Sequence, residues 1–232
     1  MDTMKTIGII GGMSPESTEL YYKIINKTIN QRLGSHHNAQ IILISVNFEI
    51  IKQLQINCNW QEAGVILADA AYRLQQAGAD FILLATNTMH KVAAQIESAV
   101  TIPFIHLADA TASCIKKQNI KKIGLLGTYF TMSDDFYKER LIKQNISVIV
   151  PDEITQTIIH NIIFDELCLG KIEESSRKIY LDCIDKLVRD GAEAIILGCT
   201  EITLLIDQSH TQVRLFDTTA IHALCAVDLA LA

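Results

Sequence analysis

The sequence predicts an α/β protein built from two similar lobes, each a parallel sheet flanked by helices. Two observations support this prediction. Short apolar runs alternate along the chain with longer stretches in which apolar residues recur at helical spacing, and this alternation is typical of right-handed βαβ units. In addition, the second half of the chain repeats features of the first half.

The repeat is clearest where a strand-like segment runs into a polar turn. Residues 78–88 resemble residues 191–201 at an offset of 113 (191 − 78). This alignment sets the hydroxyl of Thr86 against the thiol of Cys199. Each half thus contributes one reactive side chain at equivalent positions, an arrangement suited to chemistry on two faces of one small molecule.

A second pair of segments extends the repeat. Residues 7–12 resemble residues 123–128 at an offset of 116 (123 − 7). We therefore predict a first lobe at 1–115 and a second at 116–216, with a C-terminal helix at 217–232 that joins the first lobe. A chain of 232 residues is long enough for one large core or two smaller ones.

The predicted strands are mostly continuous apolar runs bounded by Gly, Asn or Asp, as expected of strands buried on both faces of a parallel sheet. The helices are expected in the amphipathic stretches between them. In order, the first half is predicted to contain strands at 6–10, 41–46, 81–85 and 104–106, and helices at 19–32, 60–77, 91–99 and 110–118.

The second half follows the same plan. One of its helical stretches, at 161–171, is expected to end at Gly170. In order, the predicted strands lie at 122–126, 147–150, 194–197 and 214–216, and the remaining helices at 134–144, 174–190 and 219–231.

Composition excludes several classes of partner. The net charge is −6 without a basic tract, so no nucleic acid is expected to bind. The apolar run at 6–10 is too short for a secretory signal or a membrane span, and we expect no membrane association. The six cysteines form no Cys-x-x-Cys pair and no zinc-type pattern with histidine, which predicts no metal site and a reducing, cytoplasmic location.

Ligands of parallel sheets bind beyond the carboxyl ends of the strands, and four turns qualify. The first begins at Gly11 and Gly12, where backbone amides could approach a carboxylate, and Ser14 with Pro15 is a typical helix start. The glycine spacing does not match the dinucleotide motif. A helix start alone would also explain this turn.

The second turn runs from Thr86 to His90 and holds a series of polar side chains that packing does not explain. Asn87 or Thr88 could instead serve to cap a helix that begins near Met89. His90 alone is better explained as a residue of that helix terminus than as a catalytic base.

The third turn carries Cys199 and is the strongest chemical candidate. A thiol between a strand and a helix lies near the positive end of the helix, which is expected to lower the thiol pKa. Thr200 and Glu201 follow it. The other five cysteines lack such neighbours and are expected to be inert (Cys58, Cys114, Cys168, Cys183 and Cys225).

The fourth turn offers hydroxyl groups. Thr128 and Thr131 could donate hydrogen bonds to a ligand, although Thr131 or Ser133 could equally cap the next helix. Lys171 is expected just past a helix end, where it could reach an anion.

These turns together resemble the cofactor-independent aspartate/glutamate racemase family, over essentially the whole chain. The resemblance to cell-wall glutamate racemases is weaker, because those carry a histidine where Glu201 stands. The matching motifs, in the family's order, are Gly11-Gly12-Met13-Ser14 with Glu16-Ser17-Thr18, Asn87-Thr88-Met89-His90, Gly127-Thr128 with Thr131-Met132, and Gly198-Cys199-Thr200-Glu201-Ile202.

The resemblance implies a homodimer of two pseudo-symmetric lobes, with the site in the cleft between them and no cofactor. It implies two bases on opposite faces of the substrate Cα, which fall on Thr86 and Cys199 by position. Most members have two cysteines, so Thr86 makes this chain similar to a threonine/cysteine branch that prefers L-aspartate or L-glutamate. The implied substrate contacts are Met13, Gln55, Asn87, Thr88, Thr200 and Lys171.

A threonine hydroxyl is a poor base without an activating partner. We therefore expect a strong directional bias. The family position of Cys199 implies that it deprotonates the L enantiomer, and we expect Thr86, or water held by it, to reprotonate the other face. Two alternatives remain open from sequence. One is a single-thiol decarboxylase or isomerase of the same superfamily, and the other is a non-catalytic amino-acid-binding protein.

Overall fold

A computed structural model describes residues 4–232, so the first three residues of the predicted first lobe lie outside the described part of the chain. The chain divides into two compact units, and each is described by itself. The first contains the chain up to Leu107 together with His222–Ala232, and the second contains Ala108–Ile221.

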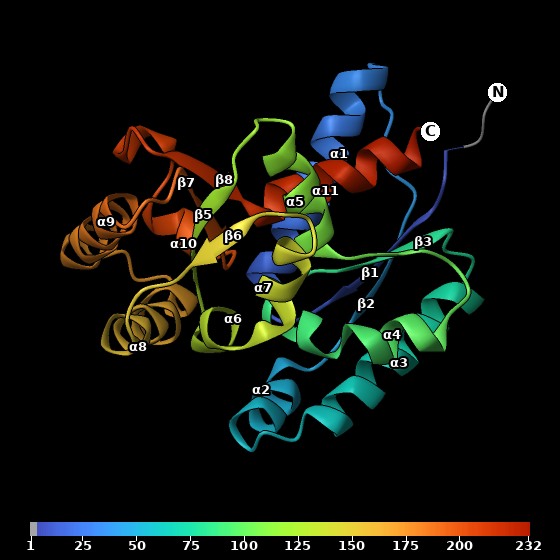
Figure 1. Ribbon diagram of the computed structural model, residues 1–232. Helices are drawn as coiled ribbons and strands as arrows, with labels where there is room; N and C mark the ends of the chain where they lie inside the picture. Colours follow the sequence, from blue (N-terminus) through green and yellow to red (C-terminus); the bar gives the residue numbers. More distant parts are fainter. Residues whose placement is uncertain (1–3) are drawn as a thin grey trace. The chain divides into compact units, whose positions relative to one another are not determined.

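The first unit has a parallel four-stranded sheet in the order β2-β1-β3-β4, of which Figure 1 labels β1, β2 and β3. Parallel pairing sets Ile7 of β1 opposite Phe81 of β3. The strands are β1 (Ile7–Gly11), β2 (Ile41–Ser45), β3 (Phe81–Leu84) and β4 (Phe104–Ile105), and the helices are α1 (Pro15–Leu33), α2 (Phe48–Ile56), α3 (Trp60–Gln76), the 3₁₀ helix η1 (Thr88–Val92), α4 (Ala93–Ala99) and parts of α5 (Leu107–Lys116) and α11 (Thr218–Ala230).

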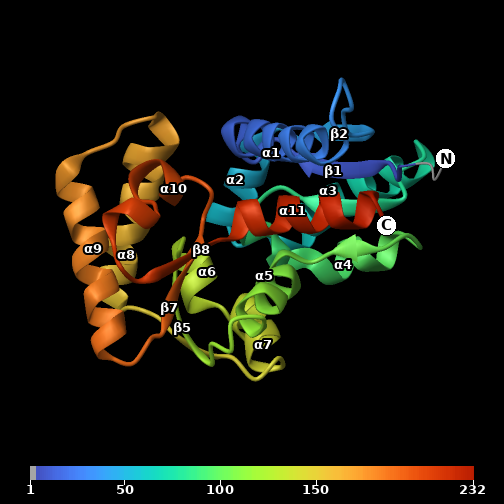
Figure 2. The same cartoon turned by 90° about the horizontal axis from the view of Figure 1, so that it is seen from above.

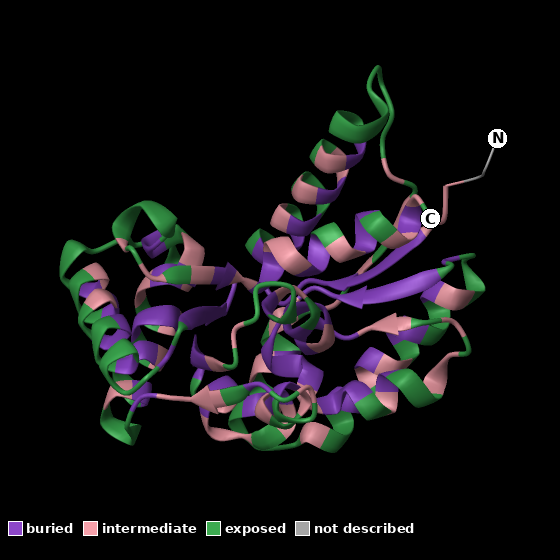
Figure 3. Cartoon of the chain, turned by 45° about the horizontal axis from the view of Figure 1, so that its top comes forward, coloured by how far each residue is buried: buried purple, intermediate pink, exposed green. Residues whose placement is uncertain are grey.

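Both faces of this sheet are covered, because alternate residues of each strand point to opposite sides. Ile7 and Ile9 of β1 pack with apolar residues of α1 and α11. Ile10 packs on the other face, with residues of α2, α3 and α4. The central strands β1 and β3 are accordingly buried, whereas the edge strands β2 and β4 are only partly buried and the outer faces of the helices are exposed (Figure 3).

The second unit repeats this plan, with a parallel sheet in the order β6-β5-β7-β8. Ile123 of β5 lies opposite Ala194 of β7, as Ile7 lies opposite Phe81 in the first unit. The strands are β5 (Lys122–Gly127), β6 (Ser147–Ile149), β7 (Ala194–Gly198) and β8 (Arg214–Asp217), and the helices are α6 (Tyr129–Ser133), α7 (Asp135–Ile142), α8 (Glu153–Asn161), the π-helix η2 (Ile162–Glu166), the 3₁₀ helices η3 (Leu167–Leu169) and η4 (Gln208–His210), α9 (Glu174–Arg189) and α10 (Ile202–Leu205).

Helices α8 and α9 lie on one side of β5 and β7, and α5 and α7 lie on the other (Figure 2). The predicted α/β class, with two parallel sheets flanked by helices, is confirmed. The two halves of the sequence repeat occupy equivalent strands, because β3 and β7 hold the same place in the two sheets.

The structure also contains helices that the sequence analysis did not predict. Helix α8 begins at Glu153, and the helical segment it opens continues through η2 and η3 to Gly170. The predicted helix at 161–171 was therefore too short at its start, although Gly170 ends it with the left-handed φ of 71°. Helix α2 was missed entirely.

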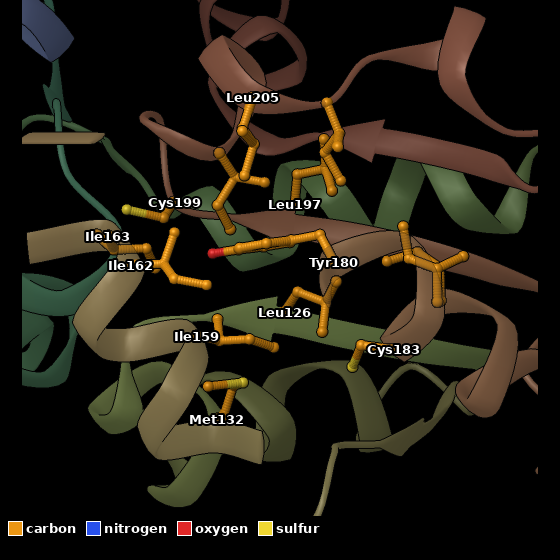
Figure 4. Packing of buried hydrophobic residues seen from close by; sticks show 14 of the residues in the cluster. Leu126, Met132, Ile159, Ile162, Ile163, Tyr180, Cys183, Leu197, Cys199 and Leu205 are labelled. Atoms are coloured by element: carbon orange, nitrogen blue, oxygen red, sulfur yellow. The ribbon is translucent and has the colours of Figure 1, made fainter. Parts of the chain in front are cut away.

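Three buried side-chain polar atoms of the second unit have no hydrogen-bond partner among the described residues, namely Ser133 Oγ, Gln156 Oε1 and the Tyr180 hydroxyl. The side chain of Tyr180 is fully buried in an apolar cluster with Leu126, Ile163 and Cys199 (Figure 4). No described residue donates a hydrogen bond to the Tyr180 hydroxyl oxygen or accepts one from this hydroxyl. Burial raises the pKa of this hydroxyl well above its ordinary value, and the nearby Cys199 adds to the effect.

We expect Tyr180→Phe to leave the free energy of unfolding unchanged or to raise it by about 1 kcal/mol, because a buried hydroxyl without a partner costs desolvation energy. Urea unfolding followed by circular dichroism measures this. A loss of about 1 kcal/mol or more would mean that the hydroxyl has a partner such as an ordered water.

Candidate active site

In the first unit, β1 and β3 are neighbours in a parallel sheet, so the turns that follow them lie at the same edge. Met13 and Met89, one from each turn, belong to the same apolar cluster. Gln55 reaches this cluster from α2, and its Nε2 atom lies 2.9 Å from Sδ of Met89. Three elements that are separate in sequence therefore meet beyond the strand ends.

The turn after β1 is a helix start, as predicted. Ser14 caps α1 by accepting a hydrogen bond from the Ser17 amide at 3.2 Å. Gly12 has a φ of 88°, and an added Cβ would lie 2.3 Å from the Val46 carbonyl oxygen, so only glycine fits there. Its amide donates to Oγ1 of Thr18 at 2.8 Å. This amide is thus engaged within the turn and does not point to a ligand in this state.

The turn after β3 contains Thr86, Asn87 and Thr88. Thr86 is half-buried, and the other two are buried. Asn87 is the N-cap residue of η1, but its side chain forms no capping hydrogen bond. The explanation that the Asn87 side chain caps this helix was therefore wrong. Among the described residues, none forms a hydrogen bond with the Thr86 hydroxyl, whose side chain therefore lacks an activating base there.

In the second unit, Cys199 directly follows the last residue of β7. Its thiol donates a hydrogen bond to Oε2 of Glu201 at 2.8 Å, and both side chains are buried. The apolar side of Cys199 packs with Ile162, Ile163 and Tyr180, as Figure 4 shows. The site thus pairs one buried thiol with one carboxylate two residues later.

This environment raises the pKa of the Cys199 thiol, although a lower pKa was expected from the sequence. Burial raises the pKa of Cys199 well above its ordinary value, and the negative charge of Glu201 raises it further. The expected lowering by a helix terminus was wrong because burial and the charge of Glu201 dominate the thiol pKa, and the helix that follows, α10, contains only four residues, Ile202–Leu205. Without substrate, Cys199 is therefore a protonated thiol whose proton faces a carboxylate.

The hydroxyl groups near Cys199 are largely engaged in structure. Thr128 caps α6 by accepting from the Thr131 amide, so capping in this turn falls to Thr128 rather than to Thr131 or Ser133. Thr131 is fully buried, and its hydroxyl pairs with that of Thr128 at 3.1 Å. A Cβ on Gly198 would lie 3.2 Å from the Thr131 methyl group, so this turn packs against the strand that leads to Cys199.

Two further predicted contacts lie in the second unit. The Thr200 hydroxyl is 3.1 Å from that of Thr219, and Thr200 is buried. Lys171 is exposed and follows Gly170, and its amide donates to the Glu166 carbonyl at 3.0 Å. Lys171 is the only one of the predicted contacts that is exposed.

The described side chains contain no cluster of three His, Cys, Asp or Glu that could hold a metal ion. Within residues 4–232, no helix combines the length and apolar character needed to cross a membrane.

Comparison with known proteins identifies the family. The family described as Asp/Glu/Hydantoin racemase matches residues 10–226. The chain belongs to this family. It is thus an enzyme of the isomerase class, a racemase.

Three relatives illustrate the range of similarity. The broad-specificity amino-acid racemase RacX of Bacillus subtilis is 25% identical over 97% of this chain and 98% of its own length. A Yersinia pestis protein assigned as an Asp/Glu racemase has a crystal structure that is 52% identical, with a TM-score of 0.94, over 99% of this chain and 100% of that one. An aspartate racemase homologue from Pyrococcus horikoshii is 35% identical, with a TM-score of 0.86, over 99% and 100% of the two chains.

Sequence reasoning missed the direct pairing of Cys199 with Glu201 in this racemase. A carboxylate two residues after a thiol at a strand end was the available signal. It also missed the contacts of His90, because they involve backbone groups on either side of its ring and leave no mark in the sequence.

The first unit also buries a histidine, His222 of α11. The Ile105 carbonyl can only accept, so Nε2–H of His222 donates to it at 2.7 Å. Nδ1 must then accept from the Tyr21 hydroxyl at 2.8 Å. Burial lowers the pKa of His222 from 6.5 to about 4, although the bond to Ile105 opposes this shift.

His222 should therefore make the racemase sensitive to acid. Between pH 6.5 and about pH 4, the unfolded chain binds a proton at His222 that the folded chain does not. The stability from the neutral ring is fully present above the unfolded pKa and is lost as the pH falls through this window, by up to about 3 kcal/mol. Urea unfolding should show a smaller loss between neutral pH and about pH 4 in His222→Gln than in the unchanged protein. Equal losses in both proteins would contradict this assignment.

Proposed function

We propose that this racemase inverts the α-carbon of aspartate or glutamate without pyridoxal phosphate and favours the L enantiomer. The observation that carries the proposal is the buried Cys199–Glu201 pair, which combines a thiol with a proton acceptor at the end of a strand. The names of the two similar solved proteins, an assigned Asp/Glu racemase and an aspartate racemase homologue, favour an acidic substrate.

The first step needs a thiolate. The proton of the Cys199 thiol passes to Oε2 of Glu201, which already accepts its hydrogen bond. A substrate ammonium group near the pair would offset the charge that holds the thiol pKa high. The thiolate then removes the α-proton of the L enantiomer, and the electron pair left on Cα spreads onto the substrate carboxylate.

The second step returns a proton to the opposite face of Cα. Thr86, or a water held by its hydroxyl, gives that proton and recovers one from solvent. A hydroxyl without an activating partner is a much weaker base than a thiolate. Proton removal from the D enantiomer is therefore slow, which gives the bias toward L substrates.

The remaining predicted residues would bind the substrate. Asn87, Thr88 and Thr200 are buried polar groups at strand ends, suited to a carboxylate or an ammonium. Met13 and Gln55 would limit the size of the substrate. The Thr128 hydroxyl would donate a hydrogen bond to the substrate, and Lys171 would attract its acidic side chain. Full burial of Thr131 argues that it supports Thr128 rather than touching the substrate.

We further propose that the protein works in a reducing cytoplasm as a homodimer. All six cysteines are free, and free thiols suit that compartment.

Glu201→Gln should slow α-proton exchange by about ten- to a hundredfold at neutral pH, because the amide can accept a hydrogen bond but cannot take the thiol proton. The loss of the negative charge should also lower the thiol pKa. Exchange by the variant should therefore recover as the pH rises. The exposed Glu173→Gln is a matched control, and equal rates in Glu201→Gln and Glu173→Gln would remove Glu201 from the mechanism.

The experiment that tests the proposed function is a survey of α-proton exchange in deuterated water, without added pyridoxal phosphate. L- and D-aspartate, L- and D-glutamate and several neutral amino acids are incubated with the protein and followed by NMR and chiral chromatography. Exchange with L-aspartate or L-glutamate is the expected result. Tight binding without exchange would indicate a binding protein, and carbon dioxide release from an arylmalonate would indicate a decarboxylase.

A further inference from the structure

The ring of His90 is held between two backbone groups of the first unit. One ring nitrogen, Nδ1, lies 2.8 Å from the Thr86 carbonyl oxygen, and the other, Nε2, lies 3.2 Å from the Leu107 amide nitrogen. An amide N–H can only donate, so Nε2 accepts. Nδ1 must then carry the proton and donate to Thr86, which fixes a neutral ring in one tautomer.

The two peptide groups around Thr86 are therefore both held by side chains. Oγ of Ser17, on α1, donates to the Ala85 carbonyl at 3.0 Å. His90 holds the next carbonyl, that of Thr86 itself. With both carbonyls fixed, the backbone of the turn is fixed, and so is the direction in which the Thr86 side chain leaves it.

The ring of His90 is itself enclosed. It is 2% exposed, and its centroid lies 4.5 Å from that of His106 and 5.9 Å from that of His222. His222 is held in turn by Tyr21 and by the Ile105 carbonyl. His90 and His222 thus have tautomers set by their partners, and the rings of His106 and His222 both pack against the ring of His90.

The start of η1 is held by these contacts rather than by a capping side chain, because Asn87 has no side-chain capping bond. We propose that His90 is a positioning residue for Thr86: its Nδ1–H holds the Thr86 carbonyl so that the hydroxyl, or the water it binds, faces the substrate. The inference rests on the proposed function, because it assigns His90 to the second proton transfer and not to the first.

The two proton transfers can be measured separately. When an L substrate reacts in deuterated water, removal and return of the proton by Cys199 give deuterated L product. Return from the Thr86 face gives deuterated D product. The ratio of D product to deuterated L product therefore reports the Thr86 face alone, and a general loss of folding or binding would lower both products together.

Two substitutions separate the contacts of His90. The amide nitrogen of asparagine takes the place of Nδ1, so His90→Asn keeps a donor for the Thr86 carbonyl and loses the Leu107 contact. The amide of glutamine lies near the place of Nε2, so His90→Gln keeps an acceptor for Leu107 and loses the donor to Thr86.

We expect His90→Gln to lower formation of D product at least about tenfold while deuteration of the L substrate stays within about twofold. His90→Asn should keep both rates within about threefold of the unchanged protein. The exposed His37→Gln is the control for substitution as such. Ser17→Ala, which frees the Ala85 carbonyl, should also lower D product selectively and gives a second reading if a His90 variant does not fold.

The positioning role is overturned if His90→Gln lowers both products equally, if His90→Asn loses D product as strongly as His90→Gln, or if neither changes the ratio. Failure of the proposed function looks different, because the unchanged protein would then show no exchange with either enantiomer.

Discussion

Replacement of Cys199 by alanine is expected to reduce α-proton exchange with L-aspartate or L-glutamate by at least about a thousandfold, to the limit of detection. Its thiol is the only group in the Cys199–Glu201 pair that can become a strong base toward carbon after giving up its proton. Alanine removes this group and leaves the strand β7 and its turn otherwise intact, since the side chain is small.

The measurement is deuterium incorporation by NMR, with binding of the substrate followed separately by calorimetry. Cys114→Ala is the matched control, because Cys114 lies in α5 and has no assigned role. It should retain the full rate. If Cys199→Ala kept more than about a tenth of the exchange rate, another group would have to be the base and the proposed mechanism would fail.

Replacement of Thr86 by cysteine is expected to raise proton removal from the D enantiomer by about a hundredfold or more, since a positioned general base contributes about 10²- to 10⁴-fold. Thr86 and Cys199 occupy equivalent places after β3 and β7. The substitution therefore gives the first half the same reactive group as the second half, at a half-buried position that accepts a side chain of similar size.

The initial rates of exchange from pure D and pure L substrate should become similar in Thr86→Cys, whereas they differ strongly in the unchanged protein. Thr86→Ser is the control, because it keeps a hydroxyl and adds no thiol, and it should keep the L bias. An unchanged D rate in Thr86→Cys would show that this position does not face the substrate Cα.

Most of the fold could be predicted from sequence because each buried parallel strand is a short apolar run with a turn at its end. The registers of the two sheets agree with the two repeat offsets, because Ile123 opposite Ala194 is the counterpart of Ile7 opposite Phe81 (123 − 7 = 116 and 194 − 81 = 113). Helix α8 was missed because isoleucine and threonine dominate it, and β-branched residues lower helix propensity. Tertiary packing and the Asp152 cap stabilise it instead.

The candidate site was less predictable, and the pKa of Cys199 shows why. A thiol after a strand suggests a helix terminus, but its pKa depends on the length of that helix, on apolar neighbours from α8 and α9, and on the distance to one carboxylate. Only the carboxylate and the helix are close in sequence, and their geometry depends on how the turn folds, whereas the apolar neighbours come from distant segments. His90 is similar, because its partners are backbone atoms whose positions the whole unit determines.

The raised pKa of Cys199 has a consequence beyond proton transfer. Peroxides and alkylating agents attack the thiolate rather than the thiol. A cysteine that stays protonated and buried until a substrate arrives is shielded from oxidation to sulfenic and sulfinic acids. The sulfur atom of Cys199 would thus stay unreactive while no substrate is bound, and its oxidation would be limited to the time of turnover.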